Sequence, residues 1–206
     1  MNSRRSRCST SNVAMIHPDG KDWTWVLERR CDECGFDAQA FPRERVGALT
    51  RDVATTWATV LQRADVAVRH RDDRWSALEY ACHVRDVFRI YDERLRRMLS
   101  EDGPHYANWD QDATAAAERY GEQEPAAVAA EIAEIAPVLA SRFDSVSGDQ
   151  WDRAGYRSDG AAFTIESFAR YFVHDPIHHL WDVGFGSRVG SRWSGRLAAA
   201  TRRRLR

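Results

Sequence analysis

Apolar residues that recur every three or four positions along four long stretches are the feature that most limits the fold of this 206-residue chain. In one stretch, Ser76 followed by Glu79 predicts a capping box at the start of a helix. The apolar stripe of this helix consists of Tyr80, Val84, Val87, Tyr91, Leu95 and Met98. Gly103 and Pro104 predict its end. A helix with one long apolar face must bury that face against other elements.

Three further stretches have the same period. One begins at Val46, one follows Pro125, which suits the first turn of a helix, and one runs from about Thr164 to Gly184. The chain has no convincing run of alternating strands, although short extended pieces between residues 151 and 164 remain open. Four such helices predict an all-α four-helix bundle.

Polar or arginine-rich segments flank the predicted bundle. The expected organisation is a disordered segment at 1–20, an N-terminal extension at 21–42, a metal-binding bundle at 43–185 and a flexible Arg-rich tail at 186–206. Met15 opens a better patterned segment than Met1 does, so both remain candidate start sites.

The charge balance and the absence of long apolar runs restrict the class of protein. A net charge of −1 gives no preference for nucleic acid, and no stretch approaches the roughly 18 apolar residues of a membrane helix. No apolar segment follows the N-terminal arginines, so we expect a cytoplasmic protein without a secretory signal. We expect a small-molecule substrate and no nucleic-acid or membrane partner, and a homodimer remains open.

The strongest chemical motif is His174-x-x-x-His178 in the fourth helix. Histidines four residues apart share a helix face, and both imidazoles can then reach one ion at about 2.1 Å. His83 lies at the edge of the apolar stripe of the second helix, where a buried imidazole needs a partner. We therefore predict a divalent metal ion on these three histidines. The alternative is a set of hydrogen-bonded core histidines.

The segment Tyr80-Ala-Cys-His83-Val-Arg-Asp86 and the run from His174 to His179 resemble the DinB/YfiT-like superfamily over about residues 43–185. The resemblance implies a four-helix bundle with a divalent metal on three side chains, at His83, His174 and His178. That superfamily includes thiol-dependent enzymes such as mycothiol-dependent maleylpyruvate isomerase.

Three nitrogen ligands would leave open positions on the ion, as in catalytic sites, and zinc or nickel would fit. We expect Asp86, His179 and Asp182 to surround and orient the ligands, although both carboxylates could simply be solvated. The leading hypothesis is an S-transferase or isomerase that uses a low-molecular-weight thiol of the mycothiol type. The alternatives are a hydrolase that uses a metal-bound water and a non-catalytic metal-binding stress-response module.

The motif Cys31-Asp-Glu-Cys34-Gly35 is typical of a zinc knuckle, in which the glycine permits a tight turn. A four-ligand site needs two more donors, for which Cys8, His17 and His105 are candidates. A redox dithiol and two unpaired thiols remain open alternatives.

The connection after the second helix carries Tyr106, Asn108, Trp109 and Asp110. Long ordered loops often form the wall of a binding site, so these residues are candidates for a pocket. The alternative is a polar connector held in place by its aromatic residues.

Overall fold

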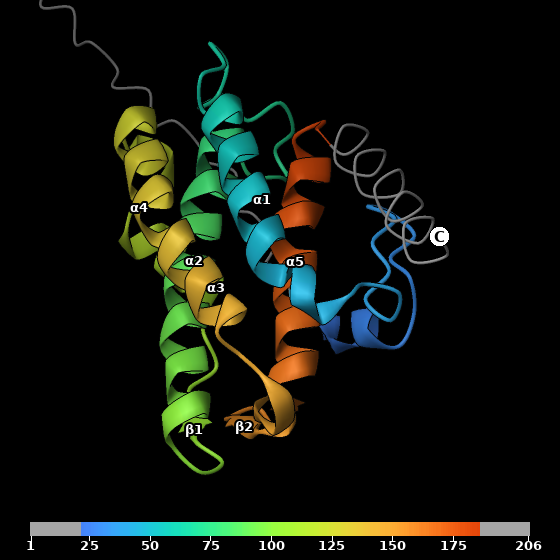
Figure 1. Cartoon of the computed structure of the whole chain (residues 1–206). Coiled ribbons are helices and arrows are strands. Elements are labelled where there is room, and N and C mark those ends of the chain that lie inside the picture. The colour runs from blue at the N-terminus through green and yellow to red at the C-terminus, as the bar shows by residue number, and fades with distance from the viewer. Residues whose placement is uncertain (1–21, 186–206) are drawn as a thin grey trace, which may run out of the picture.

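The computed structural model describes residues 22–185, and four long helices form its bundle (Figure 1). These helices are α1 (Val46–Val60), α2 (Ala77–Ser100), α4 (Pro125–Asp144) and α5 (Ile165–Asp182). The shorter elements are α3 (Gln111–Ala117), the 3-10 helices Trp23–Leu27, Arg43–Arg45, Tyr120–Glu122 and Gly148–Asp152, and the strands β1 (His105–Tyr106), β2 (Ala154–Arg157) and β3 (Ala162–Thr164). The predicted four-helix bundle is confirmed.

Local signals start and stop the helices where the sequence predicts. The Ser76 hydroxyl accepts from the Glu79 N–H at 3.2 Å, and the Glu79 carboxylate accepts from the Ser76 N–H at 2.8 Å. Thr164 caps α5, and Pro125 occupies the first turn of α4. Gly184, which follows α5, has a φ of +82°, a conformation that glycine adopts without strain.

The helices pack closely around a core that includes Trp57, Phe88 and Phe172. The tightest approach is between α1 and α4 at Gly47. A Cβ atom at this position would lie 2.6 Å from the Ala140 carbonyl oxygen and 2.1 Å from Asp144 Oδ1. Only a residue without a side chain therefore fits at this crossing.

A small sheet lies at one end of the bundle (Figure 1). Strand β1 pairs with β2 in parallel, with His105 opposite Tyr156, and β2 pairs with β3 antiparallel. The structure therefore contains extended pieces within residues 151–164, and β1 and α3 lie in the connection that follows α2. These elements are minor beside the helices, so the all-α class holds.

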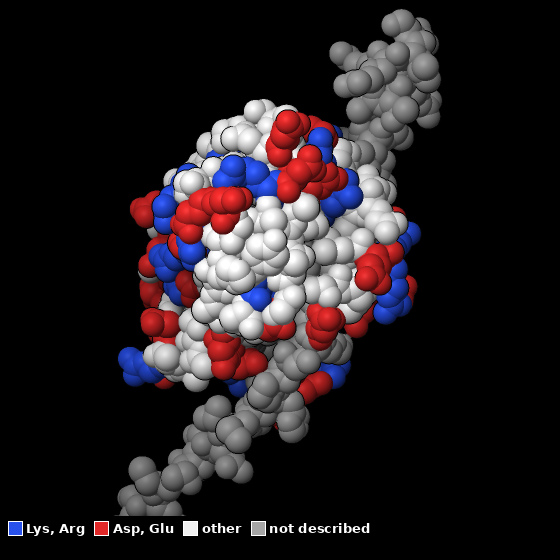
Figure 2. All heavy atoms as spheres, turned by 90° about the horizontal axis from the view of Figure 1, so that it is seen from below, with Lys and Arg blue, Asp and Glu red and all other residues white. Residues whose placement is uncertain are grey.

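Within residues 22–185, no helix is both long and apolar enough to cross a membrane. Figure 2 views the sheet end, where acidic and basic side chains are mixed around a largely uncharged face. The predicted disordered segment (1–20), the Arg-rich tail (186–206), the start at Met15 and the candidate ligands Cys8 and His17 lie outside the described residues.

Candidate functional site

The structure places the three predicted metal ligands in two different clusters. The Cys/His cluster consists of Cys31, Cys34, His174 and His178. The pocket cluster consists of His83, Asp175 and His179. Within each cluster, one ligand atom from every residue lies within 4.8 Å of those of the others. The expectation that His83 shares a site with His174 and His178 therefore differs from the observed arrangement.

The geometry of a helix explains this division. Successive residues are about 100° apart, so the i, i+4 pairs His174/His178 and Asp175/His179 form two stripes on different sides of α5. The core stripe of α5 contains Ile165, Phe168 and Phe172, all at most 1% exposed. On a helical wheel, Asp175 and His179 lie about 35° from the centre of that stripe, and His174 and His178 lie about 130° from it. Only Asp175 and His179 can therefore face α2 beside the core.

The pocket cluster has the spacing of a cation site. His83 Nε2 lies 3.3 Å from Asp175 Oδ2, and His179 Nε2 lies 3.9 Å from Asp175 Oδ1. Two ligand atoms at about 2.1 Å from an ion, about 90–110° apart, would be about 3.0–3.4 Å from each other. Within the described residues, His83 Nδ1 and Asp175 Oδ1 are buried without a hydrogen-bond partner. Two imidazoles and a carboxylate therefore fit a divalent cation.

Asp182 orients one of these ligands. The His179 Nδ1–H donates to Asp182 Oδ2 at 2.9 Å, which leaves Nε2 directed towards Asp175. Arg74 pairs with the other oxygen of Asp182. Such a carboxylate sets the tautomer and ring orientation of a metal-binding histidine. His179, expected to orient the ligands, is itself a member of the pocket cluster, and Asp182 contacts its ring.

Asp86 has a structural position that differs from the expected one. Its carboxylate accepts two hydrogen bonds from Arg85, at 2.9 and 3.0 Å, and one from the Tyr120 hydroxyl at 2.5 Å. Asp86 lies one helical turn from His83 in the sequence, yet it faces the segment around Tyr120. Burial opposes its charge, but Arg85 and Tyr120 outweigh that effect and lower the pKa of Asp86.

Electrostatics favour an ionised Asp175 and a neutral His174. Burial alone would raise the pKa of Asp175, but His83 and His179 outweigh burial and lower it to about 2. Burial, followed by the neighbouring His178, lowers the pKa of His174 to about 3, so this imidazole is neutral. A neutral imidazole and an ionised carboxylate are the ligand forms of these side chains.

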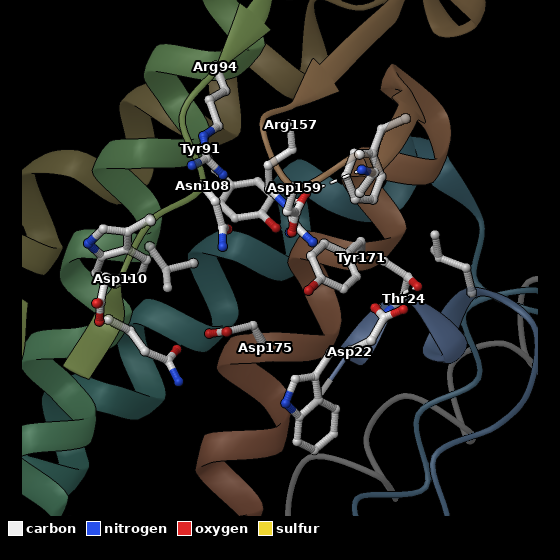
Figure 3. A pocket seen from close by; sticks show the side chains of 18 of the residues that line it. Asp22, Thr24, Tyr91, Arg94, Asn108, Asp110, Arg157, Asp159, Tyr171 and Asp175 are labelled. Carbon is white, nitrogen blue, oxygen red and sulfur yellow. Dashed lines mark hydrogen bonds and ion pairs between the residues drawn. The ribbon is translucent and has the colours of Figure 1, made fainter. Parts of the chain in front are cut away.

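The pocket cluster opens into a pocket of about 820 Å³ (Figure 3). Helix α2 lines it with His83, Val87, Tyr91 and Arg94, which follow one another at steps of four, four and three. Tyr171 and Asp175 line it from α5, and Arg157 lines it from β2. Of the loop residues predicted to line a pocket, Asn108, Trp109 and Asp110 do so. Tyr106 is instead buried in the core, with its hydroxyl 4.0 Å from Met98 Sδ.

Arg94 differs from the other arginine of the pocket, Arg157, in its ion pairing. Its side chain is buried, and it donates to the Ala107 carbonyl oxygen at 2.7 Å. No carboxylate among residues 22–185 forms an ion pair with it, and burial lowers the pKa of its guanidinium. Arg157, by contrast, is paired with Asp159 at 2.9 Å. Arg94 thus offers a cation to a ligand with an acidic group.

Five residues of this site were not predicted from the sequence: Asp175, Tyr91, Arg94, Arg157 and Tyr171. A signal existed for Asp175, because Asp175-x-x-x-His179 has the same spacing as the histidine pair and lies closer to the apolar stripe. The two tyrosines and two arginines are assembled from separate elements, so no local motif marks them.

The fold and the donor clusters define a four-helix-bundle protein with candidate metal sites. The profile of the DinB superfamily matches residues 48–183, and the chain belongs to this superfamily. YfiT from Bacillus subtilis, described as a probable metal-dependent hydrolase with an unusual four-helix bundle topology, has a similar structure, with a TM-score of 0.62 and 17% identity. The similarity covers 72% of this chain and 87% of YfiT, and at this identity it shows a shared fold. No curated protein matches the chain.

Proposed function

We propose that the protein is a metal-dependent hydrolase of a small molecule and that the pocket cluster holds its ion. The convergence of His83, Asp175 and His179 on the wall of a large pocket carries this proposal. Two histidines with one carboxylate also bind the ion in several zinc hydrolases, and three protein ligands leave a position for water or substrate. The description of YfiT as a metal-dependent hydrolase supports the same reaction class.

When bound, such an ion polarises the scissile group and lowers the pKa of a coordinated water towards 7. The chain's own residues prepare the site. Asp182 fixes the ring of His179 through the bond to Nδ1. Trp109 stacks on His83 with ring centroids 5.2 Å apart, and Trp75 packs at 5.5 Å, so the two indoles restrict the movement of this ligand and exclude water from it.

Two arginines in the pocket offer a place for an acidic group of a substrate, although five aspartates also line it, Asp22, Asp110, Asp112, Asp159 and Asp175. In Figure 3, Tyr91, Tyr171 and Asp175 border the same space as Arg94 and Arg157. Guanidinium groups bind carboxylates and phosphates through two parallel hydrogen bonds, which would orient a substrate relative to the pocket cluster. We therefore expect the hydrolysed molecule to carry an acidic group.

A thiol-dependent transferase or isomerase is the second candidate. The observation that favours it is the pocket volume of about 820 Å³, near the upper end of the roughly 300–1,000 Å³ found for ligand pockets. A substrate and a small thiol could therefore bind together. A requirement for added low-molecular-weight thiol would distinguish this reaction from hydrolysis.

The test compares the full-length protein with His83→Ala and His179→Ala. Each variant should lose the ion of the pocket cluster and its hydrolytic turnover on a panel of small acidic esters and amides. The control is His70→Ala, because His70 is exposed and pairs with Asp65 on the surface. Full turnover and metal content in both site variants would contradict the proposal. Turnover only with added thiol would select the second candidate, and oxygen-dependent turnover with bound iron would replace both.

A further inference from the structure

We propose that the Cys/His cluster is a second metal site, a tetrahedral zinc site that fastens the N-terminal extension to α5. This site is separate from the pocket cluster, and its existence does not depend on the proposed hydrolytic function. Its donors come from opposite ends of the described chain, Cys31 and Cys34 from the extension and His174 and His178 from α5.

The extension forms the turn that brings two sulfurs to one ion. The Gly35 N–H donates to the Cys31 carbonyl at 2.9 Å, and the Cys31 N–H donates to the Phe36 carbonyl at 2.9 Å. Gly35 has a φ of +74°, a conformation that side chains other than glycine rarely adopt. The local structure of Cys-x-x-Cys-Gly therefore matches a zinc knuckle.

The distance between donors agrees with tetrahedral coordination. Bond lengths of about 2.3 Å for zinc–sulfur and 2.1 Å for zinc–nitrogen at a tetrahedral angle give a sulfur–nitrogen separation of about 3.6 Å. Cys31 Sγ and His178 Nδ1 are 3.7 Å apart. The other ring nitrogen, Nε2, lies 3.3 Å from a carboxylate oxygen of Glu33. Nδ1 can thus face the ion while Glu33 accepts the proton on Nε2.

The burial of the donors separates this site from the alternatives. Cys31 is 1% exposed, His174 4% and His178 6%. A redox dithiol needs an accessible thiolate, which the burial of Cys31 opposes, whereas Cys34 is half-buried. A disulfide between Cys31 and Cys34 would still leave His174 Nε2, which is buried without a hydrogen-bond partner among the described residues, unsatisfied. A cation satisfies all four donors together.

Four protein donors leave no position for a substrate, which is typical of structural zinc. The consequence concerns the wall of the neighbouring pocket. The Trp23 ring lies 5.6 Å from the ring of His174 and 5.1 Å from that of His178, and Trp23 also lines the pocket with Asp22 and Leu27. The extension runs beside α5 (Figure 1). Zinc at this cluster therefore holds one wall of the pocket in place.

Cobalt replacement in the full-length protein tests the site. The protein produced with cobalt should show thiolate-to-cobalt charge-transfer absorption, and metal analysis should find one equivalent of zinc or cobalt lost in Cys31→Ser. Cys82→Ala is the matched control, because Cys82 is also buried but bonds to the Tyr120 carbonyl outside the cluster. The band should persist in this control and in His83→Ala, which alters only the pocket cluster. Absence of the band from the cobalt-loaded protein, or its persistence in a Cys31→Ser/Cys34→Ser variant, would overturn the proposal.

A second measurement, limited proteolysis and thiol labelling, uses the wild-type protein and so does not depend on the folding of a cysteine variant. Arg29 and Arg30 lie on the exposed part of the extension, and trypsin cleaves after arginine. Removal of zinc with a chelator should speed cleavage there by about tenfold or more, because the extension then opens locally. It should also expose Cys31 and Cys34 to thiol reagents, as mapped by mass spectrometry. Unchanged cleavage and labelling after complete loss of zinc would overturn the fastening role, as would an isolated Cys31–Cys34 disulfide.

Discussion

Replacing Asp86 by alanine should destabilise the fold without removing metal. Asp86 lies one helical turn from the candidate ligand His83, yet its carboxylate bonds to Arg85 and Tyr120 rather than to the pocket cluster. Asp86 is 9% exposed and Arg85 5%, so the substitution would leave a buried guanidinium without its nearest carboxylate.

The expected loss of unfolding free energy depends on the hydrogen-bond partners that Arg85 keeps in the variant. Loss of one partner of a buried ion pair costs about 3–5 kcal/mol. Arg85 retains Gln123 at 2.6 Å and Glu131 at 2.9 Å, so we expect the lower end, about 3 kcal/mol. In a domain of this size, about 2–4 °C per kcal/mol corresponds to a fall in Tm of roughly 6–12 °C.

Thermal and urea unfolding of the metal-loaded protein, together with metal analysis, measures both effects. Asp92→Ala is the control, because Asp92 lies on the same helix and pairs with Arg142 at 2.7 Å, but with side chains 16% and 28% exposed. Loss of the Asp92–Arg142 pair should lower the free energy of unfolding by about 1 kcal/mol or less. If Asp86→Ala lost an equivalent of metal while unfolding like Asp92→Ala, our assignment of Asp86 to a structural role would be wrong.

The pH dependence of the same variant gives an independent check. The pKa of Asp86 is lower in the folded protein than its value of about 3.9 in an unfolded chain. Its contribution is therefore complete above that unfolded value and is lost as the pH falls through the folded pKa. The stability difference between wild type and Asp86→Ala should be constant from pH 5 to 7 and shrink below about pH 4. A difference that grew under acid conditions would contradict this assignment.

Three other substitutions test the packing, the donor orientation and the pocket. Gly47→Ala should lower the free energy of unfolding by about 1–3 kcal/mol in urea denaturation. Gly121→Ala, whose Cβ would lie 3.4 Å from its nearest neighbour, should lower it less. Equal losses in the two variants would contradict the close approach of α1 and α4. Asp182→Asn should weaken metal retention at the pocket cluster by about 10–100-fold in competition with a chelator, and unchanged retention would show that the bond to His179 has no orienting role. Arg94→Ala should lower the preference for acidic over neutral substrates by about tenfold or more in kcat/KM, and an unchanged ratio would place the substrate's acidic group elsewhere.

Much of the fold follows from local sequence signals. Ser76, Glu79, Pro125 and Thr164 act on backbone groups within one turn of themselves, so they mark helix starts whatever surrounds them. The three-and-four spacing of apolar residues then selects the buried face of each helix. The small sheet was harder to predict, because β1 and β2 are two and four residues long and their paired residues, such as Tyr106 and Arg157, lie 51 positions apart in the sequence.

The sequence by itself determined that α5 carries candidate metal donors at four-residue spacing and that the extension carries a Cys-x-x-Cys-Gly motif. Only the tertiary structure decided which of these candidate donors lie together. His174 and Asp175 each begin a stripe of two donors, and the side of α5 that meets α2 is set by burial of Phe168 and Phe172. That burial turns Asp175 towards His83 and leaves the His174 face to the extension. Donor sets depend on contacts between distant segments, because one helix can align only its own side chains.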